Sequence, residues 1–186
     1  MQELIQYLSD NKELANALAA IAGVVVAAIA CIVSFASLYF SIKALKYQRH
    51  HNKLSVTPIP EVTVADYENS IRVKLRNNGS GPIIVKSVSV INGKESRASL
   101  IEWMPALPNN RHWTTFSHSL VNRSLLPGSE LILLELTACA SETGFAKCRE
   151  KCRLALSVLI VEVDFTDVYK SAFLKYSKSL DWFGRH

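Results

Sequence analysis

The segment ALAAIAGVVVAAIACIVSFASLYFSI, Ala17 to Ile42, decides how the rest of this chain is interpreted. No charged residue occurs between Glu13 and Lys43. At 1.5 Å per residue the segment forms a helix about 39 Å long, which exceeds the roughly 30 Å hydrocarbon thickness of a bilayer. A soluble helix of this length needs a polar face, and this segment has none. The sequence therefore predicts a transmembrane helix over residues 14–42.

Small and polar residues recur along this helix at alternating spacings of four and three. Such a heptad repeat places them on one stripe, here called the small-residue seam. Helices in lipid associate through close backbone approach, so the seam predicts a homo-oligomer. A plain membrane anchor is the alternative interpretation, because alanine-rich spans match this pattern by chance. The seam consists of Asn16, Ala20, Gly23, Ala27, Ala30, Ser34, Ser37 and Ser41.

The three serines at one end of the seam allow two interpretations. They can line a narrow polar path through an oligomer, or each hydroxyl can bond the carbonyl four residues earlier in its own helix.

The charges flanking the span predict its orientation. Lys12 is the one basic residue on the N-terminal side, whereas Lys43, Lys46, Arg49 and Lys53 follow the span. The positive-inside rule then places residues 1–13 outside the cytoplasm and the C-terminal domain in the cytoplasm, at a bacterial inner membrane. The basic residues would lie at the height of the lipid headgroups. The apolar segment is too long for a signal peptide and lacks a basic region before it.

The remaining chain divides into a basic juxtamembrane helix and linker over residues 43–60 and one cytoplasmic domain over residues 61–186. That domain has the commonest domain size. Its cysteines are Cys139, Cys148 and Cys152, an odd number without zinc-ligand spacing, which favours reduced thiols.

Alternating apolar and basic residues in Ile71–Arg76 predict a half-buried strand, followed by a turn over residues 77–82 and a second strand, Ile83–Ile91. No regular helical spacing is evident, although a short helix is expected within Ser96–Leu107. The pattern predicts an antiparallel β-sandwich, immunoglobulin-like in the loose sense. The other expected strands are Val62–Ala65, Glu130–Leu136, Leu154–Asp164 and Val168–Tyr176, and Cys139–Arg153 is expected as a basic insertion.

Catalytic signatures are missing from the sequence. It contains no nucleophile elbow, zinc-protease helix, phosphate-binding glycine loop or dinucleotide fingerprint. Asp164 and Asp167 are interpreted as turn and cap residues. We therefore expect a protein that is not an enzyme and that uses neither a cofactor nor a metal.

Basic residues next to an aromatic residue predict a different kind of site. Cations beside a stacking surface suit an anionic nucleotide or a single-stranded oligonucleotide. A solvated sheet face is the alternative. The candidate ligand-binding residues are Arg72, Lys74 and Arg76 on one strand, Lys86 on the next strand, and Arg111, His112 and Trp113 in a loop.

Three segments, RVKLRNNGSGPIIVKSVSV, LLPGSELILLEL and VEVDFTDVYKSAF, together with the span and the basic helix, resemble small membrane effectors of bacterial anti-phage defence systems. The Hailong-type transmembrane effector is the nearest of these. The resemblance implies a homo-oligomeric channel, held closed by a nucleotide-derived signal from a partner nucleotidyltransferase. It implies no individual functional residue.

Two functions follow as hypotheses. The first is an oligomeric membrane effector, a channel or membrane-disrupting protein gated by an anionic ligand on the cytoplasmic domain. The second is a membrane-anchored adaptor whose sandwich binds a protein partner and which has no channel activity.

Overall fold

The computed structural model describes residues 12–108, 111–139 and 144–185. The chain divides into two compact units, the first ending at Asn52 and the second running from Lys53 to His186. Most of the segment expected outside the cytoplasm, residues 1–13, lies outside the described residues.

Helix α2 is continuous from Lys12 to Ser55. It contains the predicted span and the predicted juxtamembrane helix without a break. By length and composition it is the one helix among the described residues that can cross a membrane. None of its side chains is buried in the protein. A helix with so much exposed apolar surface is expected to contact lipid or other helices.

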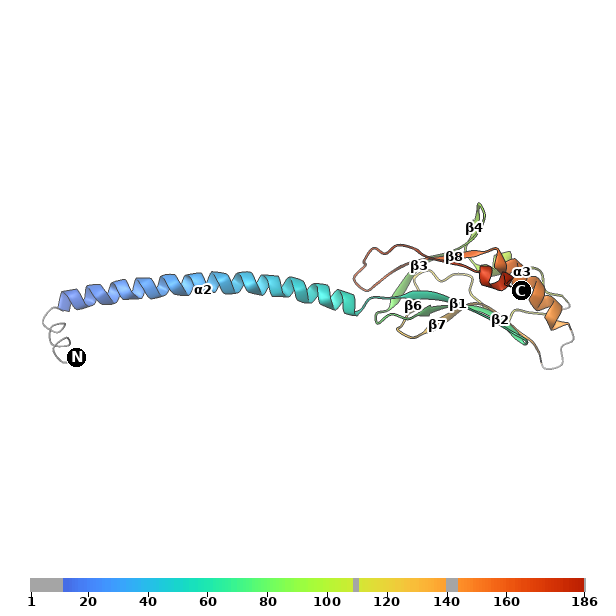
Figure 1. Ribbon diagram of the computed structural model, residues 1–186, viewed down its shortest axis with the longest axis horizontal. Coiled ribbons are helices and arrows are strands. Elements are labelled where there is room, and N and C mark those ends of the chain that lie inside the picture. Colours follow the sequence, from blue (N-terminus) through green and yellow to red (C-terminus); the bar gives the residue numbers. More distant parts are fainter. Residues whose placement is uncertain (1–11, 109–110, 140–143, 186) are drawn as a thin grey trace. The chain divides into compact units, whose positions relative to one another are not determined.

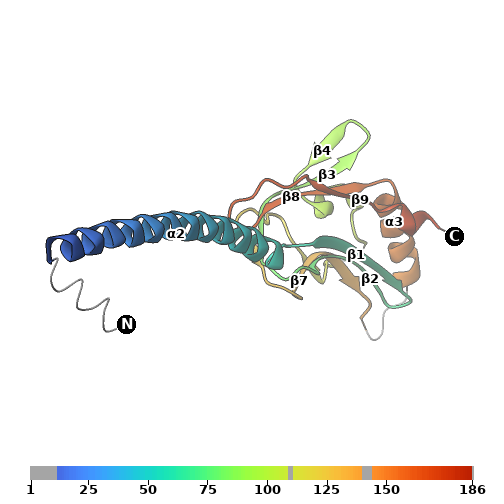
Figure 2. The same cartoon turned by 60° about the vertical axis from the view of Figure 1, so that its left-hand side comes forward.

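Two antiparallel sheets make up the second unit (Figure 1; Figure 2). Sheet A has the order β1 (Pro60–Tyr67), β2 (Ser70–Asn77), β7 (Glu130–Thr137), β5 (Thr115–Phe116). Sheet B has the order β4 (Glu95–Arg97), β3 (Ile83–Asn92), β8 (Ile160–Thr166), β9 (Tyr176–Ser179), and β6 (Ser124–Leu125) also pairs with β3.

Period-two patterning explains how the two sheets make one core. In β2 the side chains of Ile71, Val73 and Leu75 are buried, and in β8 those of Val161 and Val163 are buried. Side chains from both sheets belong to a single hydrophobic cluster. The predicted two-sheet antiparallel architecture is therefore confirmed, with its four long strands beginning and ending close to the expected residues.

The prediction of a strand over Leu154–Asp164 is wrong in its first part. Residues Phe145–Ser157 form the helix α3, and β8 begins only at Ile160. The buried residues of α3 are Phe145, Cys148, Cys152 and Leu156, which recur at helical spacing along one face. The expectation of a domain without helical spacing is therefore also wrong. Charged residues between these four positions make the apolar stripe hard to recognise in the sequence.

The strand expected over Val168–Tyr176 is also displaced. Residues 167–175 form a loop, and β9 begins at Tyr176. The carboxylate of Asp167 accepts hydrogen bonds from the Tyr169 N–H at 2.9 Å, the Ser171 N–H at 2.8 Å and the Ser171 hydroxyl at 2.7 Å. These bonds close a turn in which the backbone cannot extend. The short helix expected within Ser96–Leu107 is the 3₁₀ helix η1, Leu100–Trp103, and a second one, η2, spans Asp181–Gly184.

The segment between α2 and β1 is bonded to one end of the sandwich. The Ser80 hydroxyl donates to the Ser55 carbonyl at 2.6 Å, and the Ser80 N–H donates to the Thr57 carbonyl at 3.2 Å. The N–H of Asn78 donates to the Ile59 carbonyl at 2.9 Å. This segment is therefore part of the folded domain.

Candidate functional site

The three predicted cations of β2 lie on the outer face of sheet A and have carboxylate partners on β7. The Lys74 Nζ lies 2.8 Å from Glu130 Oε2, and Arg76 Nη1 lies 3.8 Å from Glu130 Oε1. Arg72 Nη1 lies 3.9 Å from Glu135 Oε1. The side chains are partly exposed, so each ion pair stabilises the fold only slightly.

These residues border a shallow hollow of about 180 Å³ on the face of the sheet. Thr63, Val64 and Ala65 of the neighbouring strand β1 also line it. The hydrogen bond from Lys74 is the main reason that the pKa of Glu130 lies below its ordinary value. The carboxylate is therefore ionised at neutral pH, and an anion entering the hollow must compete with it for Lys74.

Lys86 lies on the other sheet. It belongs to β3, and its Nζ lies 3.7 Å from Asp164 Oδ1 of the neighbouring strand β8. The prediction grouped Lys86 with the cations of β2 because the two strands follow one another in the chain. The structure does not bring them together, since the turn over residues 78–82 carries the chain from sheet A to sheet B.

The loop with Arg111, His112 and Trp113 has mainly structural contacts. The Arg111 guanidinium donates to the Thr137 carbonyl at 3.0 Å and lies 4.7 Å from the centroid of the Phe145 ring. Trp113 is partly buried and packs against the hydrophobic core, whereas His112 is exposed. Part of the Trp113 ring is therefore covered, which leaves less of it open for stacking than the sequence predicts.

The structure adds one feature to the small-residue seam. The hydroxyl of Ser34 donates to the Ala30 carbonyl at 2.8 Å, and that of Ser41 donates to the Ser37 carbonyl at 2.8 Å. Two of the serine protons are thus used within the helix, as the second interpretation of these residues expected. The remaining seam positions are exposed along α2, and no side chain from the described part of the chain buries them.

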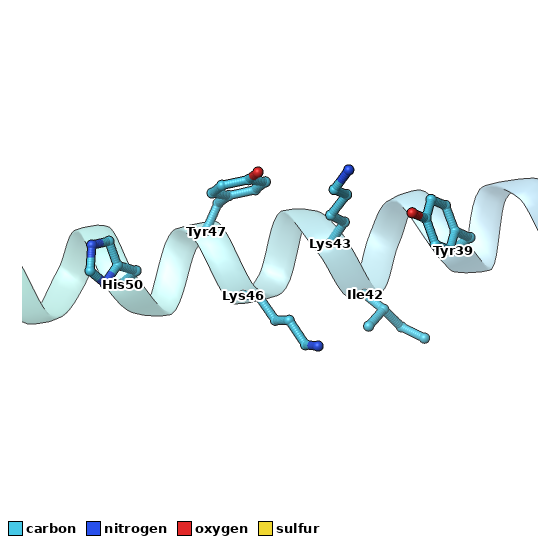
Figure 3. A pocket seen from close by; sticks show the side chains of 6 residues that line it. All are labelled: Tyr39, Ile42, Lys43, Lys46, Tyr47 and His50. Atoms are coloured by element: carbon cyan, nitrogen blue, oxygen red, sulfur yellow. The ribbon is translucent and has the colours of Figure 1, made fainter.

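At the C-terminal end of the apolar segment, aromatic and basic side chains gather on α2. Figure 3 shows Tyr39, Lys43 and Tyr47 extending from one side of the helix. The Lys43 Nζ lies 5.8 Å from the centroid of the Tyr39 ring. Tyrosines beside lysines at the end of an apolar helix are typical of the membrane–water interface. The surface hollow at this place has one helix as its wall and is lined by Tyr39, Ile42, Lys43, Lys46, Tyr47 and His50.

Two of the three cysteines of the domain, Cys148 and Cys152, are buried on α3. Burial, and to a smaller extent the neighbouring Cys148, raises the pKa of Cys152 to about 12. Such a thiol stays protonated at neutral pH and is a poor nucleophile. Within the described residues, no group of three or more His, Cys, Asp or Glu side chains could hold a metal ion.

Glu130 and Glu135 are the site residues that sequence reasoning missed. They are an odd number of residues apart, so a regular strand would place them on opposite faces. A register shift between Val73 and Lys74 changes this, and Arg72 pairs with Glu135 while Arg76 pairs with Glu130. No sequence signal announces such a bulge.

No protein-family model and no curated protein matches this sequence. Among solved structures, the archaellum periplasmic stator protein FlaG from Sulfolobus acidocaldarius matches with 12% identity and a TM-score of 0.24. The match covers 64% of this chain and 100% of that one. A TM-score this low carries no argument about fold or function.

Proposed function

We propose that this chain is a single-span membrane effector that assembles through the small-residue seam, with its sandwich receiving an anionic signal. Helix α2 crosses the bacterial inner membrane, and the sandwich lies in the cytoplasm. The observation that carries the proposal is the seam, because a continuous helix with an exposed stripe of small residues is built for close contact with other helices. A simple anchor needs no such stripe.

Replacing Gly23 by leucine should prevent assembly. A Cβ added at Gly23 has no atom within 4 Å, so the substitution fits the single helix and acts only between helices. The larger side chain holds neighbouring backbones apart and removes their close packing. Crosslinking in membranes, followed by measurement of the oligomeric mass, should show a loss of oligomer.

The matched control for that experiment is Ile29→Leu, an exposed position away from the seam. This variant should keep the oligomeric mass of the parent protein. If Gly23→Leu also keeps it, the seam is not the interface.

Channel activity separates the two hypotheses on function. Cells that express the wild-type protein together with the neighbouring genes that supply its signal should lose membrane potential. Cells that express Gly23→Leu in the same way should keep it. Depolarisation that is absent in the wild type would favour the membrane-anchored adaptor. The ion pairs favour this second candidate, since two carboxylates, Glu130 and Glu135, offset two of the three positive charges of Arg72, Lys74 and Arg76.

In the effector hypothesis, a nucleotide or a single-stranded oligonucleotide binds to the outer face of sheet A. Lys74→Glu should reduce binding of a labelled oligonucleotide at least tenfold, because it reverses the central charge of the face, and wild-type binding should weaken with salt. Lys178→Glu, on the exposed strand β9 of the other sheet, should bind normally. Equal affinity of the wild type and Lys74→Glu would exclude this face.

The proposed partner is a nucleotidyltransferase, and the proposed setting is anti-phage defence. A nucleotidyltransferase gene next to the gene for this chain would support a nucleotide-derived signal. A gene neighbourhood without such an enzyme would argue against that signal.

A further inference from the structure

One end of the sandwich, here called the tether end, contains the segment through which the domain is joined to α2. Four stretches meet there: residues 53–60, the turn 78–82, residues 120–129 and the loop 167–175. Their proximity follows from pairing, because Ile84 at the start of β3 pairs with both Ser124 and Thr166. Figure 2 shows the first residues of β1 and the loop between β8 and β9 at this same end. The positive charge of Lys53 also acts on the carboxylate of Asp167.

The tether end exposes large apolar side chains. Leu174 is 93% exposed and Leu126 is 63% exposed, and Val121, Val168 and Tyr169 are more than half exposed. Leu174 is held outward by its neighbour, because Phe173 stacks on Phe165 of β8 with ring centroids 5.1 Å apart. An apolar surface that is presented on bonded turns in this way marks an interaction site.

The charge of the tether end is positive on balance. In the four stretches, the cations are Lys53, Arg123, Lys170 and Lys175, and the carboxylate is Asp167. Two further carboxylates directly follow these stretches, Glu61, which accepts a hydrogen bond from Asn78, and Glu130, which is paired with Lys74 and Arg76. Burial tends to raise the pKa of Asp167, but the bonds from Ser171 and Tyr169 outweigh it and hold the pKa below the ordinary value. The negative charge of Asp167 is thus occupied inside its own turn, which leaves Lys170 and Lys175 of the same loop without a carboxylate of that loop beside them.

We propose that the tether end docks on the anionic headgroup surface of the bilayer that α2 crosses. Exposed leucine, valine and tyrosine side chains enter the interface between headgroups and acyl chains, and the lysines and Arg123 attract the anionic lipids around them. A second copy of the same surface would meet like charges, which disfavours it as the occupant. The inference rests on the proposed insertion of α2 and adds a second membrane contact to it.

Docking requires that α2 be inclined to the bilayer normal, because the helix continues for about 20 Å from Ile42 to Ser55. The length of the apolar segment supplies the reason for inclination. Ala17–Ile42, about 39 Å long, is longer than the hydrocarbon layer, and a helix with such a mismatch tilts.

Depth-dependent quenching in vesicles tests the inference with the full chain. A nitrobenzoxadiazole fluorophore is attached at Leu174→Cys in a Cys31→Ala, Cys139→Ser background, where the two buried cysteines remain unlabelled. In phosphatidylcholine–phosphatidylglycerol vesicles that contain a shallow spin-labelled lipid, the fluorophore should be quenched and its emission shifted to the blue. The shift should disappear with Lys170→Glu and Lys175→Glu, and weaken in phosphatidylcholine alone.

Two control labels make the result decisive. Ser96→Cys lies on β4, at the end of β3 opposite to the tether end, and should not be quenched. A label on the native Cys31 lies near the middle of the apolar segment, so with a spin label placed deep in the acyl chains it should be quenched whenever α2 is inserted. Quenching at Cys31 without quenching at Leu174 would overturn the docking and leave the proposed insertion intact. If neither label is quenched, the insertion is wrong, and the docking fails with it.

Discussion

Asn77→Ala is expected to lower the free energy of unfolding by about 3 kcal/mol or more. The Asn77 side chain is buried, and its amide nitrogen donates to the Gly81 carbonyl at 2.8 Å and to the Leu125 carbonyl at 3.0 Å. Its oxygen accepts from the Gly79 N–H at 3.0 Å and the Ile59 N–H at 3.3 Å. Alanine leaves four backbone groups without these bonds in a place with little access to water.

Asn78→Ala is the matched control. The Asn78 side chain is exposed and donates a hydrogen bond to the carboxylate of Glu61. Its loss should therefore lower the free energy of unfolding by less than about 1 kcal/mol. Chemical unfolding in detergent, followed by near-ultraviolet circular dichroism, measures both variants. Equal midpoints for the two would show that Asn77 does not hold the tether end together.

Gly81→Ala should be similarly destabilising, by a different physical route. A Cβ at this position would overlap the carbonyl of Val56, and one at Gly79 would lie 2.7 Å from the Pro58 Cα. The contacts are with backbone, so no side-chain rotation relieves them. The segment after α2 must separate from the turn, at a cost on the order of 3 kcal/mol.

Ser80→Ala lies between these two glycines and removes one exposed hydrogen bond, the one to the Ser55 carbonyl. It should change the melting temperature much less than Gly81→Ala does. Limited proteolysis after Lys53 should also become faster in Gly81→Ala, since the segment before β1 loses its attachment. A Gly81→Ala protein as stable and as protease-resistant as the wild type would contradict this account.

The sequence predicted secondary structure correctly where a single pattern, either the absence of charge or a strict alternation of residues, was present. The absence of charge predicted α2, and the alternation of Ile71, Val73 and Leu75 with basic residues predicted β2 and its buried face. The glycines of the turn over residues 78–82 marked the crossing between sheets, although composition does not tell which sheet the next strand joins. For that reason Lys86 was placed beside the wrong strand.

Sequence reasoning failed where two signals competed. The β-branched and leucine-rich run from Leu154 onward outweighed the buried stripe of Phe145, Cys148 and Cys152, so α3 was missed. The three cations of β2 lie on one face of that strand as expected, but the sequence did not show the carboxylates that pair with them. Only the register shift at Val73 and Lys74 brings Glu130 and Glu135 to the same side of the sheet, and period-two reasoning has no means to anticipate it.

The bonded segment from Ser55 to Ile59 has a consequence for association. A long flexible linker dilutes a tethered domain through the volume it can explore, whereas a short one keeps the local concentration of its neighbours in the millimolar range. Here the linker contributes almost no free chain length. If the helices assemble as proposed, each sandwich would meet the next one as an intramolecular partner, and a contact too weak to be detected between isolated domains would still be occupied.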